Sequence, residues 1–316
     1  MFGQSAGGQS ITVHLMTKDS GQYFNRVIIQ SAPIALPFRT RNEMILISDM
    51  LSLKLNCANV ACLKQKSIDE ITTAQLALKK IPSSENILQF FEPWVPYVDG
   101  KIVPAQPTTA ISQGHFIPMP IMIGSMTEDT RPYIYEGFQK PVSPSKYATL
   151  LSALKPTKSE EILKMYPPVT ISDERDALEI PATDFIFTCS IRNYSRNAGL
   201  KNGGNIWRYV YSHAFSFIKA WGHLAFCAGH VCHGSELPLL FQTANLYNFT
   251  MTSDELKLSD NLVAYWTNFA KNNNPNIGLP VPDIWPTYQP MHFDVSSKVI
   301  SDYRKEFCDF WDSIGY

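Results

Sequence analysis

Short runs of β-branched and other apolar residues, separated by long stretches with helical patterns, constrain the fold of this 316-residue chain most strongly. Arg26–Ser31, Pro120–Gly124 and Ile206–Ser212 are such runs, and their composition is typical of buried strands. Helical patterns lie between and after them, notably over Ser159–Tyr166 and Asp254–Asn272. Because parallel strands need long, usually helical connections, the pattern predicts an α/β fold with a mostly parallel sheet and helices on both faces.

The two ends of the chain extend this prediction. A first helix is expected from about Ser5 to Met16, and Asp19-Ser20-Gly21 would close it. Near the other end, Val295–Asp302 is predicted as a late edge strand and Lys305–Ile314 as a closing helix.

Composition excludes several classes of function. Lys+Arg number 27 against Asp+Glu 28, so the net charge of −1 offers no extended basic surface for a nucleic acid. No apolar run approaches the roughly 20 residues needed to cross a bilayer. None of the six cysteines forms a Cys-x-x-Cys pair, so neither a zinc ribbon nor a thioredoxin-type redox site is expected.

The first residues contain a motif that carries chemistry. Gly3-Gln4-Ser5-Ala6-Gly7 fits Gly-x-Ser-x-Gly, the turn that lifts a nucleophilic serine above a strand as a helix begins. Because this turn is crowded, glycine is expected to be required on both sides, at Gly3 and at Gly7. Gly8 extends the small-residue run, and a helical stretch follows at once. The alternative is a glycine-rich helix start without a chemical role.

Several segments along nearly the whole chain match sequence motifs of one protein family. They are Phe2–Ser10 with His14-Leu15, Phe24–Ser31, Trp266–Lys271 with Asn274-Pro275, and Trp285–Tyr288. Together they resemble the nucleophile segment, the following strand and the C-terminal signatures of type-B carboxylesterases, the cholinesterase and lipase relatives in the α/β-hydrolase fold. The resemblance implies a serine ester hydrolase that acts on a small-molecule ester or lipid through an acyl-serine intermediate. It implies neither a cofactor nor a metal.

A serine nucleophile needs a base and an acid that orients the base. Val231–Leu237 resembles the family's catalytic-histidine loop, which makes His233 the favoured base, with His230 as the near competitor. Gly124–Asp129 resembles the acid loop, in which two acidic residues follow a glycine and the second, usually Glu, is catalytic. Asp129 is therefore favoured, with Glu128 as the alternative acid, and the other of the two would be a solvated surface carboxylate.

Two neighbours of the acid are part of the same comparison. Ser31 matches a family serine that lies behind the acid and could donate a hydrogen bond to it. Thr130 stands where the family has a glycine, which is a departure from the pattern.

The resemblance covers only the second half of the family's length. There the serine follows several strands and a His-Gly-Gly segment that supplies oxyanion-hole N–H groups, so here Ala6 is the one expected donor. We therefore expect residues 1–316 to be the C-terminal portion of a single carboxylesterase domain, a fragment of a longer enzyme that starts at the nucleophile turn. The alternatives are a catalytically inactive truncated paralogue and a cholinesterase-like interaction module.

The cysteines and two sequons bear on the compartment. By resemblance, Cys57 pairs with Cys62 and Cys189 with Cys308, while Cys227 and Cys232 either bridge each other or remain free thiols. Asn193 and Asn248 each begin an Asn-x-Ser/Thr sequon and are candidate glycosylation sites. The family therefore predicts a secreted protein or one in the secretory pathway, although the N-terminal residues lack a signal-peptide pattern.

Overall fold

The computed structural model describes residues 1–78, 94–287, 289–301 and 303–316. The chain divides into two compact units, one made of Met1–Ala35 with Pro107–Tyr316 and the other of Leu36–Gln106. All six strands and all the candidate catalytic residues belong to the first unit. The prediction that residues 1–316 form part of one carboxylesterase domain stays a prediction.

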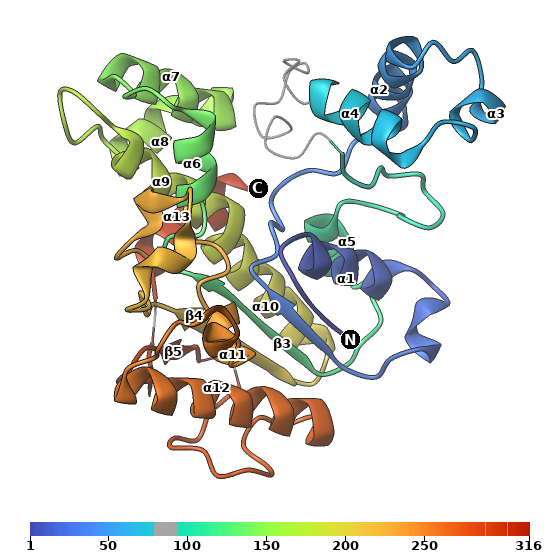
Figure 1. The fold of residues 1–316 in the computed structure, drawn as a ribbon. Helices are drawn as coiled ribbons and strands as arrows, with labels where there is room; N and C mark the ends of the chain where they lie inside the picture. Colours follow the sequence, from blue (N-terminus) through green and yellow to red (C-terminus); the bar gives the residue numbers. More distant parts are fainter. Residues whose placement is uncertain (79–93, 288, 302) are drawn as a thin grey trace. The chain divides into compact units, whose positions relative to one another are not determined.

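A six-stranded sheet in the order β1-β2-β3-β4-β5-β6 forms the centre of the larger unit (Figure 1). The first five strands are parallel, and only β6 runs antiparallel to its neighbour. Parallel strands end at the same edge of a sheet, so the loops that follow β1 to β4 gather at one side. The strands are β1 Phe2–Gln4, β2 Val27–Gln30, β3 Ile121–Met126, β4 Ile206–Tyr211, β5 Met291–Phe293 and β6 Lys298–Val299.

Helices cover both faces of this sheet, as predicted (Figure 1). On one face α1 packs on β1 and β2, α10 packs on β3 and β4, and α5 contacts both helices. On the other face Ile28, Met122 and Trp207, which are neighbours across three strands, pack with Leu262 and Phe269 of α12. The helices of this unit are α1 Ala6–Met16, α5 Pro107–Gln113, α6 Arg131–Gly137, α7 Pro144–Leu154, α8 Ser159–Met165, α9 Arg175–Thr183, α10 Cys189–Lys201, α11 Leu237–Leu240, α12 Ser253–Asn272 and α13 Lys305–Ile314.

The core on the α12 side is strongly aromatic. The ring of Tyr209 makes edge-on contacts with Trp266 and Phe293, at centroid distances of 5.1 and 6.0 Å. Tyr209 of β4 lies beside Gly124 of β3, and a Cβ on Gly124 would lie 2.4 Å from the Tyr209 ring. Glycine is therefore required in the middle of β3 to let the aromatic layer close on the sheet.

The smaller unit is helical. It contains α2 Arg41–Lys54, α3 Val60–Leu63 and α4 Ile68–Leu78. Thr40 and Glu43 form a capping box at the start of α2, in which each side chain accepts from the other residue's backbone N–H. A short disulfide-containing core of Leu55, Cys57 and Ala74 joins α2 to α4.

The predicted helices and buried strands are present, and the predicted edge strand near the C-terminus is shorter than expected. The predicted first helix, the three strands and the helices expected at Ser159–Tyr166, Asp254–Asn272 and Lys305–Ile314 occur within two residues of the expected bounds. Of the described residues of the predicted strand Val295–Asp302, only Lys298–Val299 pairs, and Val295 N and Ser297 Oγ instead donate to Asp294. β5 was not predicted, since three residues are too few to show a strand pattern. Tyr288 and Asp302 lie outside the described residues.

Candidate active site

Ser5 lies at the turn between β1 and α1. Its backbone has φ 57° and ψ −121°, a conformation that costs a non-glycine residue energy and that clusters at functional sites. Ser5 N donates to Gln30 O at 2.8 Å, which ties the turn to the end of β2. Ala6 begins α1, where the backbone N–H has no acceptor within the helix. The strand, serine and helix therefore follow one another as the motif predicts.

The glycines around Ser5 are not equivalent. A Cβ at Gly3 would lie 2.5 Å from the carbonyl carbon of Gly7, so Gly3 is required for the close approach of strand and helix. The prediction for Gly7 is wrong, because a Cβ there would meet nothing within 4 Å. Gly8 is the second tight position, with Ala32 Cβ 3.0 Å and Gln30 O 3.2 Å from a Cβ at that residue.

Asp129 and His233 form a buried pair. Asp129 Oδ1 lies 2.7 Å from His233 Nδ1, and Asp129 is completely buried. Its other oxygen, Oδ2, accepts from Ser31 Oγ at 3.1 Å and from Met126 N at 2.8 Å. A carboxylate at Nδ1 holds the proton on that nitrogen and leaves Nε2 as an acceptor, which is the tautomer that a general base needs.

Glu128 binds a different histidine. Its Oε1 lies 2.6 Å from His230 Nδ1, and its Oε2 accepts from Val231 N at 2.6 Å. Glu128 is thus not a solvated surface acid, which corrects that expectation for the second carboxylate. The two neighbouring acids and the two nearby histidines form two separate pairs, and Asp129 is the acid on His233.

The candidate residues meet at one edge of the sheet. Ser5 and Ser31 directly follow β1 and β2, and Asp129 lies one turn beyond β3; the three strands are parallel neighbours. The histidine loop reaches the same edge, because a Cβ at Gly234 would lie 4.0 Å from Gln4 Nε2. The topology therefore brings together residues that are more than 200 positions apart.

Two aromatic rings pack around His233. The ring of Tyr133 from α6 makes an edge-on contact at a centroid distance of 5.5 Å, and Phe187 lies at 5.4 Å. Phe187 belongs to a π-helical turn, Asp184–Thr188, between α9 and α10. Such turns often mark functional sites. No sequence pattern predicts that these rings contact His233. Pro181 inside α9 is the one local signal that the helix here is irregular.

Comparison with known proteins identifies the family. The model of the carboxylesterase family matches residues 1–311. The chain belongs to the carboxylesterase family. It is 33% identical over 289 residues to the cAMP-regulated D2 protein of Dictyostelium discoideum, covering 90% of this chain and 53% of that protein.

Further relatives give the same result. The crystal protein of Dictyostelium discoideum is 30% identical over 333 residues, covering all of this chain and 59% of that protein. Acetylcholinesterase 1 of Caenorhabditis elegans is 26% identical over 356 residues, covering 98% of this chain and 56% of that protein. This carboxylesterase-family chain thus spans little more than half the length of these relatives.

A buried glutamate lies next to the base in this carboxylesterase-family chain. Glu236 Oε1 accepts from Gln30 Nε2 at 2.8 Å, and Gln30 Oε1 accepts from Trp266 Nε1 at 3.2 Å. Glu236 Oε2 has no hydrogen-bond partner among the described residues. Burial raises the pKa of Glu236 to about 7, with a smaller contribution from the charge of Asp129. In the sequence, Glu236 is one residue of the Val231–Leu237 segment that resembles the histidine loop, and no pattern distinguishes it.

Three disulfides stabilise the chain. Cys57–Cys62 and Cys189–Cys308 are bonded as the family resemblance implies. The pair that the sequence left open, Cys227 and Cys232, is also a disulfide, and both residues are completely buried. That bridge ends one residue before His233.

The two sequons have different surroundings. Asn193 lies in α10, and its Nδ2 donates to Asp312 Oδ1 at 3.1 Å. Asn248 ends a short 3₁₀ helix in the left-handed conformation, with φ 60°, and it is exposed. A glycan would have to displace the Asn193 hydrogen bond but would meet no such obstacle at Asn248.

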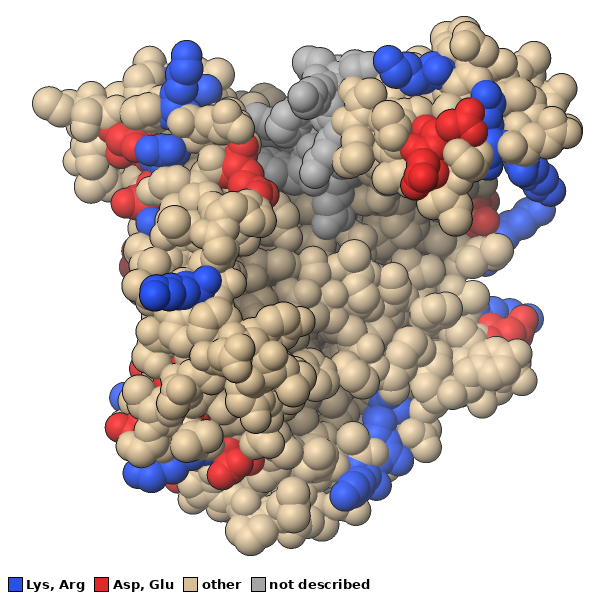
Figure 2. All heavy atoms as spheres, in the orientation of Figure 1, with Lys and Arg blue, Asp and Glu red and all other residues tan. Residues whose placement is uncertain are grey.

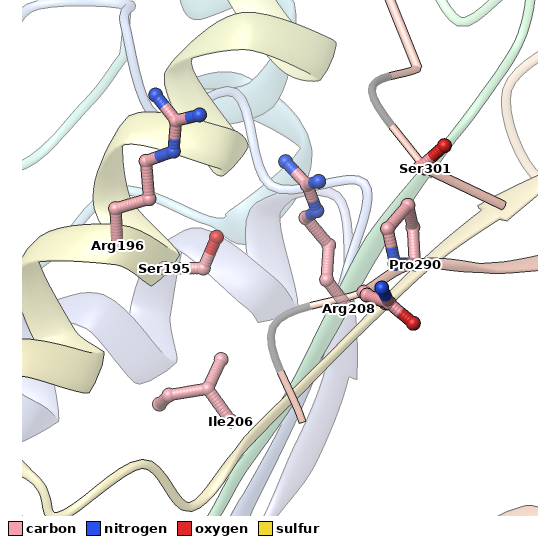
Figure 3. Close-up of a pocket in the computed structure, with 7 residues that line it drawn as sticks. Ser195, Arg196, Ile206, Arg208, Pro290 and Ser301 are labelled. Atoms are coloured by element: carbon pink, nitrogen blue, oxygen red, sulfur yellow. The ribbon is translucent and has the colours of Figure 1, made fainter. Parts of the chain in front are cut away.

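A cavity of about 390 Å³ lies elsewhere in this unit, between α10 and the end of the sheet (Figure 3). Arg196 from α10 and Arg208 from β4 contribute the charged side chains of its lining. None of its lining residues belongs to the loops of Ser5, Asp129 or His233, so it is separate from the candidate site. The lining is Ser195, Arg196, Ile206, Arg208, Gln289, Pro290 and Ser301.

The remaining features concern the charged surface, membrane spans and metal ligands. On the face drawn in Figure 2, basic and acidic side chains are interspersed within each unit. Within the described ranges, no helix combines the length and apolar character that a membrane crossing requires. The same residues contain no cluster of three or more His, Cys, Asp or Glu that could hold a metal ion.

Proposed function

We propose that this chain carries the nucleophile, base and acid of a serine ester hydrolase, in the order Ser5, His233 and Asp129. The observation that carries the proposal is the 2.7 Å contact between Asp129 Oδ1 and His233 Nδ1 at the sheet edge where Ser5 begins α1. A buried carboxylate that orients an imidazole beside a strained serine turn is the arrangement that nucleophilic acyl transfer needs.

The proposed reaction has two halves. Ser5 Oγ attacks the ester carbonyl carbon while His233 Nε2 takes the serine proton, and the carbonyl oxygen becomes an oxyanion. Collapse of this intermediate breaks the bond to the alcohol oxygen, which leaves with the proton from His233, and an acyl-serine remains. Water then attacks the acyl-serine by the same route, releasing the acid and restoring Ser5.

Each supporting group has a defined role. Ala6 N–H is positioned to stabilise the oxyanion, because the first N–H groups of a helix point at the residue before it and carry a partial positive charge. Ser31 and Met126 hold the second oxygen of Asp129, which fixes the carboxylate plane against the imidazole. The Asp129 carboxylate in turn stabilises the imidazolium that forms during each half-reaction.

The substrate class is proposed as a small-molecule ester or lipid. One relative is named as an esterase, acetylcholinesterase 1 of Caenorhabditis elegans, and another as a hydrolase, the pyrethroid hydrolase Ces2a of Mus musculus, which is 25% identical over 342 residues. The chain covers 56% of each of these relatives, so the proposal names the class of substrate and no individual ester.

We propose the secretory pathway as the location of the chain. Three disulfides among the described residues support an oxidising compartment, since such bonds are rare in the cytosol. The exposed sequon at Asn248 supports the same location.

Fluorophosphonate labelling of the 316-residue chain tests the proposal. The probe phosphonylates a serine only when its Oγ is activated, with loss of fluoride, so labelling that disappears in Ser5→Ala would support it. Circular dichroism of both proteins controls for folding. Folded protein that is not labelled would contradict activity in this chain and favour the catalytically inactive alternative, a paralogue or interaction module that acts by binding.

A further inference from the structure

The backbone that carries His233 has no regular secondary structure. It runs from Gly229 to Gly234, and both glycines are left-handed, with φ 79° and 85°. A Cβ at Gly229 would meet nothing within 4 Å, so no neighbouring atoms pack on that side of the glycine. A general base needs a fixed position, because an error of about 1 Å in catalytic geometry costs up to roughly 100-fold in rate. Something outside this segment must therefore hold it.

Glu128 provides such contacts from the turn that follows β3 and carries Asp129, which we call the acid turn. Both of its carboxylate oxygens are used, one on His230 Nδ1 and one on Val231 N, each at 2.6 Å. Glu128 also forms an isolated parallel bridge with Cys232, the residue before His233. Since Asp129 binds His233 itself, two consecutive acids bind histidines that are three residues apart.

Two further contacts fix the start of the same loop. Arg131, two residues beyond Asp129, donates from Nε to Phe226 O at 2.7 Å, and the adjacent Cys227 is bonded to Cys232. His230 lies inside this disulfide loop. The acid turn thus contacts the histidine loop at His230, Val231 and His233, and Arg131 at the start of α6 contacts Phe226 just before the loop.

We propose that Glu128 and His230 form a positioning pair that holds the His233 loop on the acid turn. This pair acts through the backbone of the loop, and neither residue touches the substrate. The side chains of Glu128 and His230 are 26% and 36% exposed, so the bond between them contributes little to global stability. Its consequence is local, because it adds side-chain contacts to a segment that has no regular secondary structure to hold it.

The inference rests in part on the proposed function, and the first experiment uses that function. The rate of fluorophosphonate labelling is measured for His230→Ala and His230→Asn. The Asn amide nitrogen occupies nearly the place of Nδ1 and keeps the hydrogen bond to Glu128 but cannot relay a proton. His223→Ala is the matched control, since His223 faces Glu136 at 3.8 Å and its side chain is 85% exposed.

The expected result is a labelling rate about tenfold lower for His230→Ala, with an unfolding temperature close to that of the parent chain. His230→Asn is expected to recover most of the lost rate, and His223→Ala to change nothing. A parent-like rate in His230→Ala would overturn the proposal. Equal losses in the Ala and Asn variants would also overturn it, because they would indicate a proton relay through His230 instead of a positioning role.

A second readout needs no activity. The hydrogen-bonded Nδ1 proton of His233 gives a low-field proton resonance, which is assigned by its loss in His233→Gln. We expect this proton to exchange with solvent about tenfold faster in Glu128→Gln and His230→Ala than in the parent chain. If the parent chain is not labelled, the proposed function fails for this chain, and unchanged exchange would separately refute the positioning pair.

Discussion

Glu236 and Glu255 are both almost completely buried, yet their carboxylates have opposite surroundings. Glu255, at the start of α12, accepts from Thr252 N, Ser216 N and Ser216 Oγ and lies 3.2 Å from His213 Nε2. Burial alone would raise its pKa, but these hydrogen bonds lower the pKa of Glu255 to about 2. Glu236 accepts from Gln30 alone among the described side chains, and burial raises its pKa to about 7.

The difference separates a stabilising region from a reactive one. The edge that carries Glu236 also holds Ser5 and Ser31 with positive φ, at 57° and 43°, and the completely buried Asp129. Strained backbone and incompletely solvated carboxylates cost stability and collect where chemistry needs them. The start of α12 shows that the same fold satisfies a buried glutamate fully when no such demand exists. Four predictions test this contrast.

Replacing the acids by amides has the largest expected effect. Asp129→Asn places an amide on His233 Nδ1, favours the wrong tautomer, and is expected to lower the fluorophosphonate labelling rate by about 10⁴-fold. Glu128→Gln should lower the same rate by only about tenfold, since it disturbs the position of the loop. Equal losses in the two variants would show that Asp129 is not the distinct partner of the base.

Glu236 and Glu255 are expected to give the stability opposite dependences on pH. The folded-state pKa of Glu236 lies above its usual 4.5, so its contribution to stability is complete below pH 4.5 and is lost as pH rises through about 7. Glu236→Gln removes this dependence. Relative to the parent chain, the variant is expected to gain on the order of 3 kcal/mol between pH 4.5 and pH 8, a shift of about 2.5 pKa units at 1.36 kcal/mol each.

Glu255 is the matched control for this experiment. Its folded-state pKa is depressed, so its stabilisation is present above pH 4.5 and is lost as pH falls towards about 2. Glu255→Gln should destabilise the chain by about 2–3 kcal/mol at pH 7, because hydrogen bonds to a charged acceptor are lost. Urea unfolding at several pH values measures both variants. If the two curves change in the same direction with pH, the contrast between the regions is wrong.

The sequence predicted the elements that have a strong periodic or compositional signal. Val-Ile-Ile in β2, the 20-residue α12 and the Gly-x-Ser-x-Gly turn each carry such a signal within a few residues. The separation of Asp129 from Glu128 could not be derived in the same way. Both acids are adjacent in sequence, and only the position of the histidine loop in space assigns each carboxylate to its imidazole.

Glycine requirements show the same limit. The motif predicts crowding on both sides of Ser5, whereas the structure concentrates it at Gly3 and Gly8. The Gly3 contact is with the Gly7 backbone inside the same turn, whereas the Gly8 contacts with Ala32 and Gln30 depend on how α1 crosses the end of β2. A local pattern contains the turn but not the angle at which the helix leaves it.

Alanine substitutions at these glycines test how tightly the reactive edge is built. Gly3→Ala brings a Cβ to 2.5 Å from backbone that cannot move freely, and overpacking of this kind costs about 1–3 kcal/mol. Gly7→Ala enters open space inside a helix and is expected to be neutral or to stabilise by up to about 1 kcal/mol. Thermal unfolding measures both, and a Gly7→Ala variant as unstable as Gly3→Ala would contradict the packing described for the turn.

The smallest expected effect concerns the two sequons. The Asn193 side-chain amide is hydrogen-bonded to Asp312, whereas Asn248 lies exposed at the end of a 3₁₀ helix. In cells that secrete the chain behind an added signal peptide, Thr250→Ala should remove one glycan, seen as a mass loss equal to that from enzymatic deglycosylation. Asn193→Ala should leave the glycan mass unchanged, because the Asn193 amide is bound to Asp312 within α10 and α13. It should instead lower stability by about 1 kcal/mol through loss of that hydrogen bond. A glycan on Asn193 would show that this residue is modified before α13 packs on α10, and the Asn193–Asp312 hydrogen bond would then be absent from the glycosylated chain.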